Sequence, residues 1–314
     1  MDIDKKFIES FVQVTEMAAY GASLFKGKGD KIAADQAAVD NMRKKLGEIT
    51  MRGKIVIGEG ELDEAPMLYV GEKVGNQKGK EFDIAVDPLE GTNFTAKNLP
   101  NALSVMAIAT KGNLLQAPDT YMEKIAIGPM LPDNLIDLDF GVKKNIRLLS
   151  EAKKTTPDKL VACVLKRSRH DLIVKSLISI GVKIKFINDG DVYGVISVAD
   201  PNSNIDIYIG TGGAPEGVLA AAALSCLECQ MQTRLVFQNA KEKERAYQLG
   251  IKDLNKKYDI KDMIKGDIIF SATGVTDGDL VKGIKDLGDF FQAETYVLHK
   301  SSKTKKKVSN KIKK

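Results

Sequence analysis

Residues 83–92 read Asp83-Ile84-Ala85-Val86-Asp87-Pro88-Leu89-Glu90-Gly91-Thr92, and this stretch decides both the fold class and the chemistry of the chain. It begins with a short apolar run that is typical of a buried β-strand. Asp87 places a carboxylate at the predicted end of that strand, and the proline after it favours a turn. Glu90 and Thr92 then add a second carboxylate and a hydroxyl. Such hard oxygen ligands suit Mg²⁺ or Mn²⁺, so the stretch predicts a divalent-metal site.

The plainer interpretation of the same stretch is a polar turn that caps a core strand. The two interpretations differ in what they ask of Asp87 and Glu90. Burying two carboxylates side by side without a cation is costly, because each loses hydration and repels the other. This cost favours the metal site.

Three further acidic positions are consistent with metal binding. Glu59 lies just beyond a predicted strand, Lys54–Ile57, and open α/β sheets bind ligands outside the carboxyl ends of their strands. Glu216 lies in the first turn of a predicted apolar helix, where the helix dipole alone would also favour a carboxylate. Asp35 lies among alanines on a predicted helix. The glycine-rich loops at 58–60 and 210–212 lack the third glycine of a dinucleotide fingerprint, which argues against a Rossmann site.

Three segments together carry a resemblance to a known family. They are IVIGEGELDEAPML (Ile55–Leu68), DPLEGT (Asp87–Thr92) and GTGGAPEG (Gly210–Gly217). DPLEGT resembles the DP(I/L)(D/E)GT signature of the metal-dependent, lithium-sensitive sugar-phosphatase superfamily. The other two segments are similar to class II, GlpX-type fructose-1,6-bisphosphatase. The resemblance extends from about Val14 to about Lys300.

The resemblance implies two divalent ions, Mn²⁺ or Mg²⁺, held by carboxylates. Asp35 and Glu59 match the ligands of one ion, and Asp87, Glu90 and Glu216 match those of the second.

It also implies roles in catalysis and substrate binding. Thr92 would position the attacking water, Asp63 would be needed for activity, and Lys31 would lie near the metals. The residues that match substrate contacts are Glu90, Gly91, Thr92, Tyr121, Arg167, Ser168, Arg169, Asp189, Gly190, Asp191 and Gly213.

The reaction that the resemblance implies is hydrolysis of fructose 1,6-bisphosphate to fructose 6-phosphate and phosphate, a step of gluconeogenesis. Sedoheptulose bisphosphate, as the sole or an additional substrate, and an inositol phosphate remain alternatives. The rival from another class is a protein that binds nucleic acid or an anionic surface through its lysine-rich end. We expect a homo-oligomer, dimer or tetramer, with no nucleic-acid or membrane partner.

The implied fold is a layered α/β/α/β/α sandwich. We expect a metal-binding subdomain at 1–155, a sugar-phosphate-binding subdomain at 156–299 and a disordered tail at 300–314. The tail contains eight lysines and no acid, so residues 1–299 are mildly acidic although the whole chain carries a net charge of +5. With only two aliphatic residues, the tail has little to bury.

Composition narrows the remaining choices. The chain has only two histidines, which excludes a multi-histidine zinc site. No apolar run approaches the roughly 20 residues of a membrane span, and the N-terminus does not resemble a signal peptide. Three cysteines cannot all pair, which favours a reducing cytoplasm. Cys226 and Cys229 form C-x-x-C, which we interpret as packing within the helix that begins near Pro215.

Overall fold

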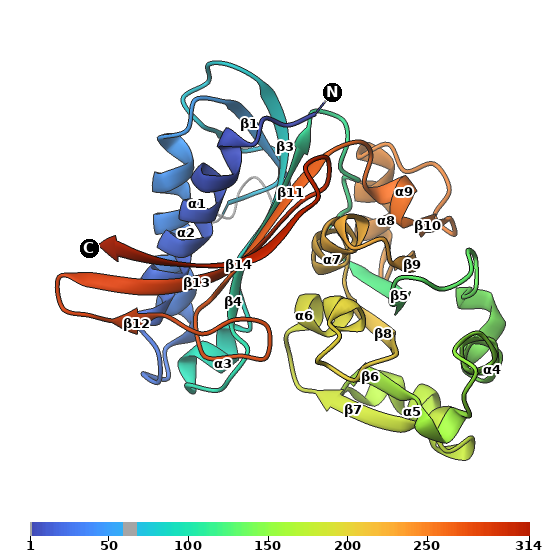
Figure 1. Ribbon diagram of the computed structural model, residues 1–314. Coiled ribbons are helices and arrows are strands. Elements are labelled where there is room, and N and C mark those ends of the chain that lie inside the picture. The colour runs from blue at the N-terminus through green and yellow to red at the C-terminus, as the bar shows by residue number, and fades with distance from the viewer. Residues whose placement is uncertain (1, 59–67) are drawn as a thin grey trace. The chain divides into compact units, whose positions relative to one another are not determined.

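The computed structural model of the protein describes residues 2–58 and 68–314, and these form two compact units. Unit 1 comprises Met1–Gln116 and Ile264–Lys314, and unit 2 comprises Ala117–Met263. Each unit contains a β-sheet with helices packed on it (Figure 1), which confirms the predicted α/β class. The order of layers across both units stays a prediction.

The structure divides the chain differently from the expected boundary near residue 155. Residues 150–159, which surround that boundary, end a helix and form a short 3₁₀ turn inside unit 2. Unit 1 is discontinuous because three long strands that complete its sheet follow unit 2 in the sequence.

Unit 1 is built on a sheet of eight strands within the described residues. Its order is β12-β13-β11-β4-β3-β1-β2, with β14 paired to β13. β1 and β3 are parallel, and every other neighbouring pair in this part of the structure is antiparallel. The strands are β1 (Arg52–Ile57), β2 (Lys73–Val74), β3 (Glu81–Glu90), β4 (Leu103–Thr110), β11 (Ile268–Gly274), β12 (Lys285–Asp286), β13 (Phe290–His299) and β14 (Thr304–Lys313).

Two long helices, α1 (Lys6–Ser23) and α2 (Lys31–Gly47), pack on each other and on this sheet (Figure 1). The apolar face of α1 is buried: Phe11 is inaccessible to solvent, and its ring meets that of Phe82 on β3 edge-on, with the ring centres 6.2 Å apart. Gly21 permits the close approach of the helices, because a methyl group there would lie 2.5 Å from the Ala37 carbonyl oxygen of α2. A short helix, α3 (Thr92–Ala96), follows β3.

The C-terminal segment is a strand, contrary to the predicted disorder of residues 300–314. β14 pairs with β13 along its whole length. Ile312 packs against the core of unit 1, and the Asn310 Nδ2 donates a hydrogen bond of 2.8 Å to Oε1 of Glu16. Glu16 is fully buried on α1, and this burial raises its pKa to about 7. Lys306, Val308, Asn310 and Ile312 occupy every second position and lie on one face of β14. The contacts that Asn310 and Ile312 make there therefore outweigh the charge of the segment.

Unit 2 contains a second sheet, of six strands in the described residues, with the order β10-β9-β5-β8-β6-β7. The pairs of β6 with β7 and with β8 are parallel, and the remaining ones are antiparallel. The strands are β5 (Tyr121–Ile127), β6 (Val161–Leu165), β7 (Lys183–Ile187), β8 (Ile207–Gly213), β9 (Gln230–Val236) and β10 (Lys257–Asp259).

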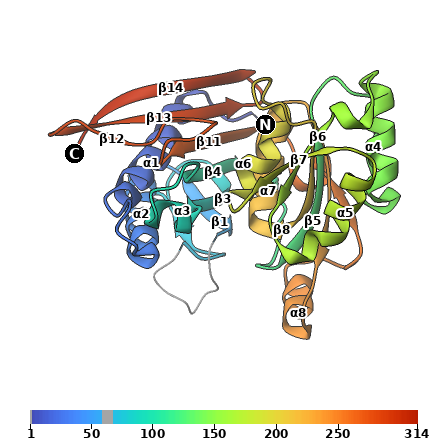
Figure 2. The same cartoon turned by 90° about the horizontal axis from the view of Figure 1, so that it is seen from below.

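Helices cover both faces of this sheet (Figure 2). On one face, Ile146 and Leu149 of α4 and Leu177 of α5 share a core with the sheet. On the other face lie α6 and the almost completely buried α7. The helices are α4 (Gly141–Ala152), α5 (Asp171–Ser179), α6 (Asp191–Ile196), α7 (Ala214–Cys226), α8 (Ala240–Gln248) and α9 (Ile260–Met263), with short 3₁₀ turns at Leu138–Phe140, Pro157–Lys159, Ser168–His170 and Ser197–Ala199.

The end of α7 differs from the prediction. The helix stops at Cys226, so the C-x-x-C pair lies across its end, with Cys229 just before β9. Apolar as α7 is, no helix in the described part of the chain is long and apolar enough to cross a membrane.

Candidate active site

The predicted acidic pair of unit 1 lies on a bulged strand. β3 does not end at Asp87 as expected but continues through Pro88 to Glu90. Asp87 lies opposite Val105 of β4 and Glu90 opposite Leu103, so three steps along β3 match two along β4. Residues three apart on a regular strand point to opposite faces, and the bulge brings them to the same side. Pro88 is tolerated there because a bulge interrupts the hydrogen-bond ladder.

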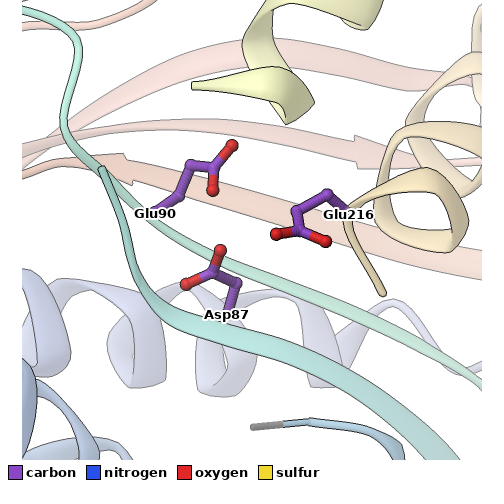
Figure 3. A group of neighbouring side chains, drawn as sticks. All are labelled: Asp87, Glu90 and Glu216. Carbon is purple, nitrogen blue, oxygen red and sulfur yellow. The ribbon is translucent and has the colours of Figure 1, made fainter. Parts of the chain in front are cut away.

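The two carboxylates are therefore close and shielded from water. Their nearest ligand oxygens lie within 4.8 Å of one another, and the residues are 7% and 5% exposed. Oδ1 of Asp87 accepts a hydrogen bond of 3.1 Å from the Leu89 amide, which orients the carboxylate. Figure 3 labels Asp87 and Glu90 on β3 of unit 1 and Glu216 on α7 of unit 2. Two buried acids that repel each other are a fitting donor set for a divalent cation.

Gly91 and Thr92 follow this pair directly. Gly91 has φ of 83°, a left-handed conformation that a side chain would strain, and it turns the chain from β3 into α3. Thr92 is the first residue of that helix and is half-buried. The turn at Gly91 thus places Thr92 at the start of α3, directly after the strand that carries Asp87 and Glu90.

Asp35 is a second carboxylate whose surroundings fit a bound cation. It is half-buried on α2, and its Oδ1 is buried without a hydrogen-bond partner among the described residues. Burial raises the pKa of Asp35 to about 6. A buried carboxylate oxygen that accepts no hydrogen bond is costly unless a cation binds it. Lys31 lies one turn earlier on the same helix and is exposed. Glu59 and Asp63 lie outside the described residues.

Glu216 lies in the first turn of α7 in unit 2, as predicted. Burial raises its pKa, and the positive charge of Lys124 opposes that rise. Its carboxylate folds back over Gly213, where a methyl group would lie only 2.0 Å from Oε2. Gly213 is therefore required to be glycine for this position of Glu216.

A basic and aromatic surface forms beside it in unit 2. The guanidinium of Arg169 lies over the ring of Tyr121, 4.8 Å from its centre. Its Nε and Nη2 donate to the Thr211 carbonyl oxygen at 3.0 and 2.8 Å, and no described residue accepts a hydrogen bond from its Nη1, so that group can bind a ligand. Ser168 precedes it and is exposed.

His170 contacts the backbone of Thr211, the residue whose carbonyl oxygen binds Arg169. It is buried: its Nδ1 lies 2.7 Å from the Leu165 carbonyl oxygen, and its Nε2 accepts a 2.8 Å bond from the Thr211 amide. These two bonds require the neutral tautomer with the proton on Nδ1, and burial lowers the pKa of the ring accordingly. His170 therefore links β6 to β8.

Arg167 and the segment Asp189–Asp191 lie close together. Nη1 of Arg167 donates to the Asn188 carbonyl oxygen at 2.6 Å, and its Nη2 lies 4.0 Å from Oδ1 of Asp189. Burial raises the pKa of Asp189, while Arg167 opposes the rise. Gly190 has φ of 78° and precedes the first residue of α6.

Sequence reasoning missed two residues of this region, Lys124 and Tyr208. Lys124 is 1% exposed on β5 and forms an ion pair with Asp191, and the Tyr208 hydroxyl donates to the same carboxylate. The signal was present: Met122, Lys124 and Ala126 share the inward face of a strand, where a lone lysine requires a buried partner.

Comparison with known proteins gives one consistent family. The profile described as "Bacterial fructose-1,6-bisphosphatase, glpX-encoded" matches residues 5–312. The class 2 fructose-1,6-bisphosphatase of Haemophilus influenzae is 42% identical, over 96% of this chain and 94% of the relative. Fructose-1,6-bisphosphatase 1 class 2 of Escherichia coli K12 is 41% identical, over 96% and 93%. A Synechococcus relative named D-fructose 1,6-bisphosphatase class 2/sedoheptulose 1,7-bisphosphatase is 38% identical, over 96% and 94%.

Two solved structures match this chain distantly. The extragenic suppressor protein suhB of Bartonella henselae is 12% identical over 61% of this chain and 74% of that chain, with a TM-score of 0.34. Thermotoga maritima IMPase is 11% identical over 62% and 73%, with a TM-score of 0.33. TM-scores this low do not establish a shared fold. The sequence relatives and the family profile cover nearly the whole chain, and the chain therefore belongs to the GlpX family of class II fructose-1,6-bisphosphatases.

Proposed function

We propose that this protein hydrolyses fructose 1,6-bisphosphate to fructose 6-phosphate and phosphate with the help of divalent cations. The observation that carries the proposal is the bulge that brings Asp87 and Glu90 within 4.8 Å in a family of this activity. We place the protein in the cytoplasm as a homo-oligomer with a sugar bisphosphate as its substrate.

Five carboxylates would hold the metal ions, Mn²⁺ or Mg²⁺. Asp35 and Glu59 would hold one, and Asp87, Glu90 and Glu216 the other. The bound ions would polarise the phosphate and lower the pKa of a coordinated water. The bare oxygen of Asp35 and the paired acids of β3 support this assignment.

Other residues of unit 1 are proposed to act on the water and the substrate. The Thr92 hydroxyl would hold the attacking water, Lys31 would offset phosphate charge near the metals, and Asp63 would be needed for activity. Glu90 and Gly91 would border the substrate together with Thr92.

In unit 2, Arg167 and Arg169 would bind the phosphate that does not react, because guanidinium groups match phosphate oxygens. The residues beside them, proposed as contacts for the rest of the substrate, are Tyr121, Ser168, Asp189, Gly190, Asp191 and Gly213.

The first test is metal dependence. Phosphate release from fructose 1,6-bisphosphate should require Mn²⁺ or Mg²⁺, because the proposed ligands are all carboxylates. Activity should vanish after dialysis against EDTA and return when Mn²⁺ is added back. Full activity after exhaustive chelation would contradict the metal assignment, and activity on other phosphate esters alone would contradict the substrate.

A second candidate activity has one observation in its favour. The Synechococcus relative carries both bisphosphatase names, although it is slightly less similar than the relatives that carry one. Assaying sedoheptulose 1,7-bisphosphate and an inositol phosphate beside fructose 1,6-bisphosphate, at one Mn²⁺ concentration, separates these activities.

Arg169→Ala tests how the bisphosphate is recognised. We expect a loss of about 1.5–3 kcal/mol in transition-state binding, or roughly 10–150-fold in kcat/KM, since a charge-assisted hydrogen bond is lost. The loss should appear mainly in KM, because the phosphate that does not react is bound about equally in ground and transition states.

Hydrolysis of p-nitrophenyl phosphate, which has no second phosphate, should hardly change in this variant. Arg147→Ala is the matched control, since Arg147 is an exposed arginine of the same unit, ion-paired with Glu151 at 3.8 Å. An equal loss on both substrates would place Arg169 at the metal centre.

A further inference from the structure

A buried ion pair lies beneath the proposed sugar-binding segment of unit 2. Lys124 projects from β5 to the carboxylate of Asp191, and its side chain is fully buried while that of Asp191 is 9% exposed. The Tyr208 hydroxyl of β8 donates to the other oxygen of the same carboxylate. Asp191 is therefore held from two strands at once.

The surrounding residues are shaped for this pair. A methyl group at Gly212 would lie 1.8 Å from Oδ2 of Asp191 and 3.1 Å from Nζ of Lys124. A methyl group at Gly217 would lie 3.2 Å from Cε of Lys124. Two glycines, on β8 and α7, thus leave the space that the lysine occupies.

A buried ion pair such as this contributes little net free energy to the stability of a fold. Desolvating an ammonium and a carboxylate offsets most of their attraction, and apolar residues of the same size would often serve stability as well. Its geometric effect is specific, however. Asp191 is the first residue of α6 and directly follows the left-handed Gly190, so holding its carboxylate fixes where the segment leaves β7 and enters the helix.

The segment before α6 also contains Asp189, whose carboxylate can be reached from solvent. The Asp189 side chain is 33% exposed and faces Arg167 at 4.0 Å, whereas both oxygens of Asp191 already accept bonds from inside the unit. A ligand hydroxyl can therefore reach Asp189 from solvent, and the position of Asp189 depends on the anchoring of Asp191 two residues later.

We propose that Lys124 and Tyr208 are positioning residues, which set the affinity for the sugar bisphosphate by holding Asp191 and, through it, Asp189 and Gly190. The proposal rests on the proposed function, because it assigns these residues to the substrate of that reaction. Neither residue is proposed to touch the substrate.

The test replaces each anchor with a residue of similar shape. Lys124→Met keeps the length of the side chain but removes its charge, and Tyr208→Phe removes a single hydroxyl. We expect KM for fructose 1,6-bisphosphate to rise about 10–100-fold in the first variant and about 3–10-fold in the second, with kcat changed less. Hydrolysis of p-nitrophenyl phosphate should stay within about three-fold of the unmodified protein in Tyr208→Phe, because this variant keeps the charge of Lys124 that opposes the rise in the pKa of Glu216.

The matched control is Lys153→Met, which removes another lysine–aspartate ion pair of unit 2, with Asp206. This variant should keep the KM of the unmodified protein. If Lys124→Met does not fold, as judged by circular dichroism and thermal unfolding, Tyr208→Phe decides the matter.

Two outcomes would overturn the inference. One is an unchanged KM in folded Lys124→Met or, where that variant is unfolded, in Tyr208→Phe. The other is an equal loss on both substrates in Tyr208→Phe, which would assign the pair to the fold or to the catalytic centre. Failure of the proposed function has a different signature, because the unmodified protein would then release no phosphate from fructose 1,6-bisphosphate.

Discussion

Thr92→Val is expected to lower kcat on fructose 1,6-bisphosphate by about 10²–10³, the usual effect of losing one catalytic hydrogen-bonding group. The reason is local: Gly91 turns the chain at the end of the acidic strand and places Thr92 at the start of α3. Valine keeps the shape of threonine but cannot orient a water molecule. Steady-state kinetics at saturating Mn²⁺ measures the effect, and Thr92→Ser should retain more activity than Thr92→Val.

The same short helix supplies a matched control. Thr95 is fully buried, and its Oγ1 has no hydrogen-bond partner among the described residues. Thr95→Val is therefore expected to keep kcat and to leave stability unchanged or slightly higher, because an unsatisfied hydroxyl is replaced by a methyl group. Equal losses in Thr92→Val and Thr95→Val would show that the effect is structural, and no loss in Thr92→Val would contradict its role.

Removing residues 304–314 is expected to destabilise unit 1 by about 3–6 kcal/mol. The estimate combines the partly buried side chain of Ile312 with lost hydrogen bonds to β13. The truncation also removes the Asn310 amide that donates to the buried carboxylate of Glu16. Urea unfolding followed by circular dichroism measures the loss, and the exposed edge of β13 should make the truncated protein prone to aggregate.

Charge is separated from structure by a second variant. Lys305, Lys307 and Lys313 are exposed on β14, and replacing all three with glutamine keeps the strand while removing three charges. This variant should unfold at nearly the same urea concentration as the unmodified protein. If the truncated protein also does, β14 contributes little to stability and the expectation of a disordered tail is restored.

Two of the misjudged parts of the chain, the end of β3 and the C-terminal segment, share a physical cause. A bulge in β3 depends on register with β4, which lies more than a dozen residues further on, so the sequence around Pro88 indicated a turn instead. The order of β14 likewise comes in part from a contact distant in sequence, because Asn310 donates to Glu16 of α1, 294 residues earlier. The lysine-rich composition indicated disorder and could not reveal that Ile312 packs against the core of unit 1.

Predictions that depended on short-range patterns were more successful. Pro215 predicted the start of α7, and the helical spacing of Phe7, Phe11 and Val14 matches the buried face of α1. Asp87 and Glu90 were expected to meet, and they do, for a geometric reason that the residues alone did not reveal. Lys124 was overlooked because its partner Asp191 is 67 residues away. The roles assigned to individual residues stay predictions until the variants are measured.

The discontinuity of unit 1 has a consequence for the order in which the protein can be made. Unit 2 is a single continuous segment and can fold as soon as residue 263 has left the ribosome. The sheet that carries Asp87 and Glu90 must wait for β11, β13 and β14, the last of which ends at Lys313. At about 5–20 residues per second, that delay is roughly 3–10 s. During it, β4 has no neighbour on the side that β11 later covers, so the nascent chain presents an open strand edge to chaperones and to other chains.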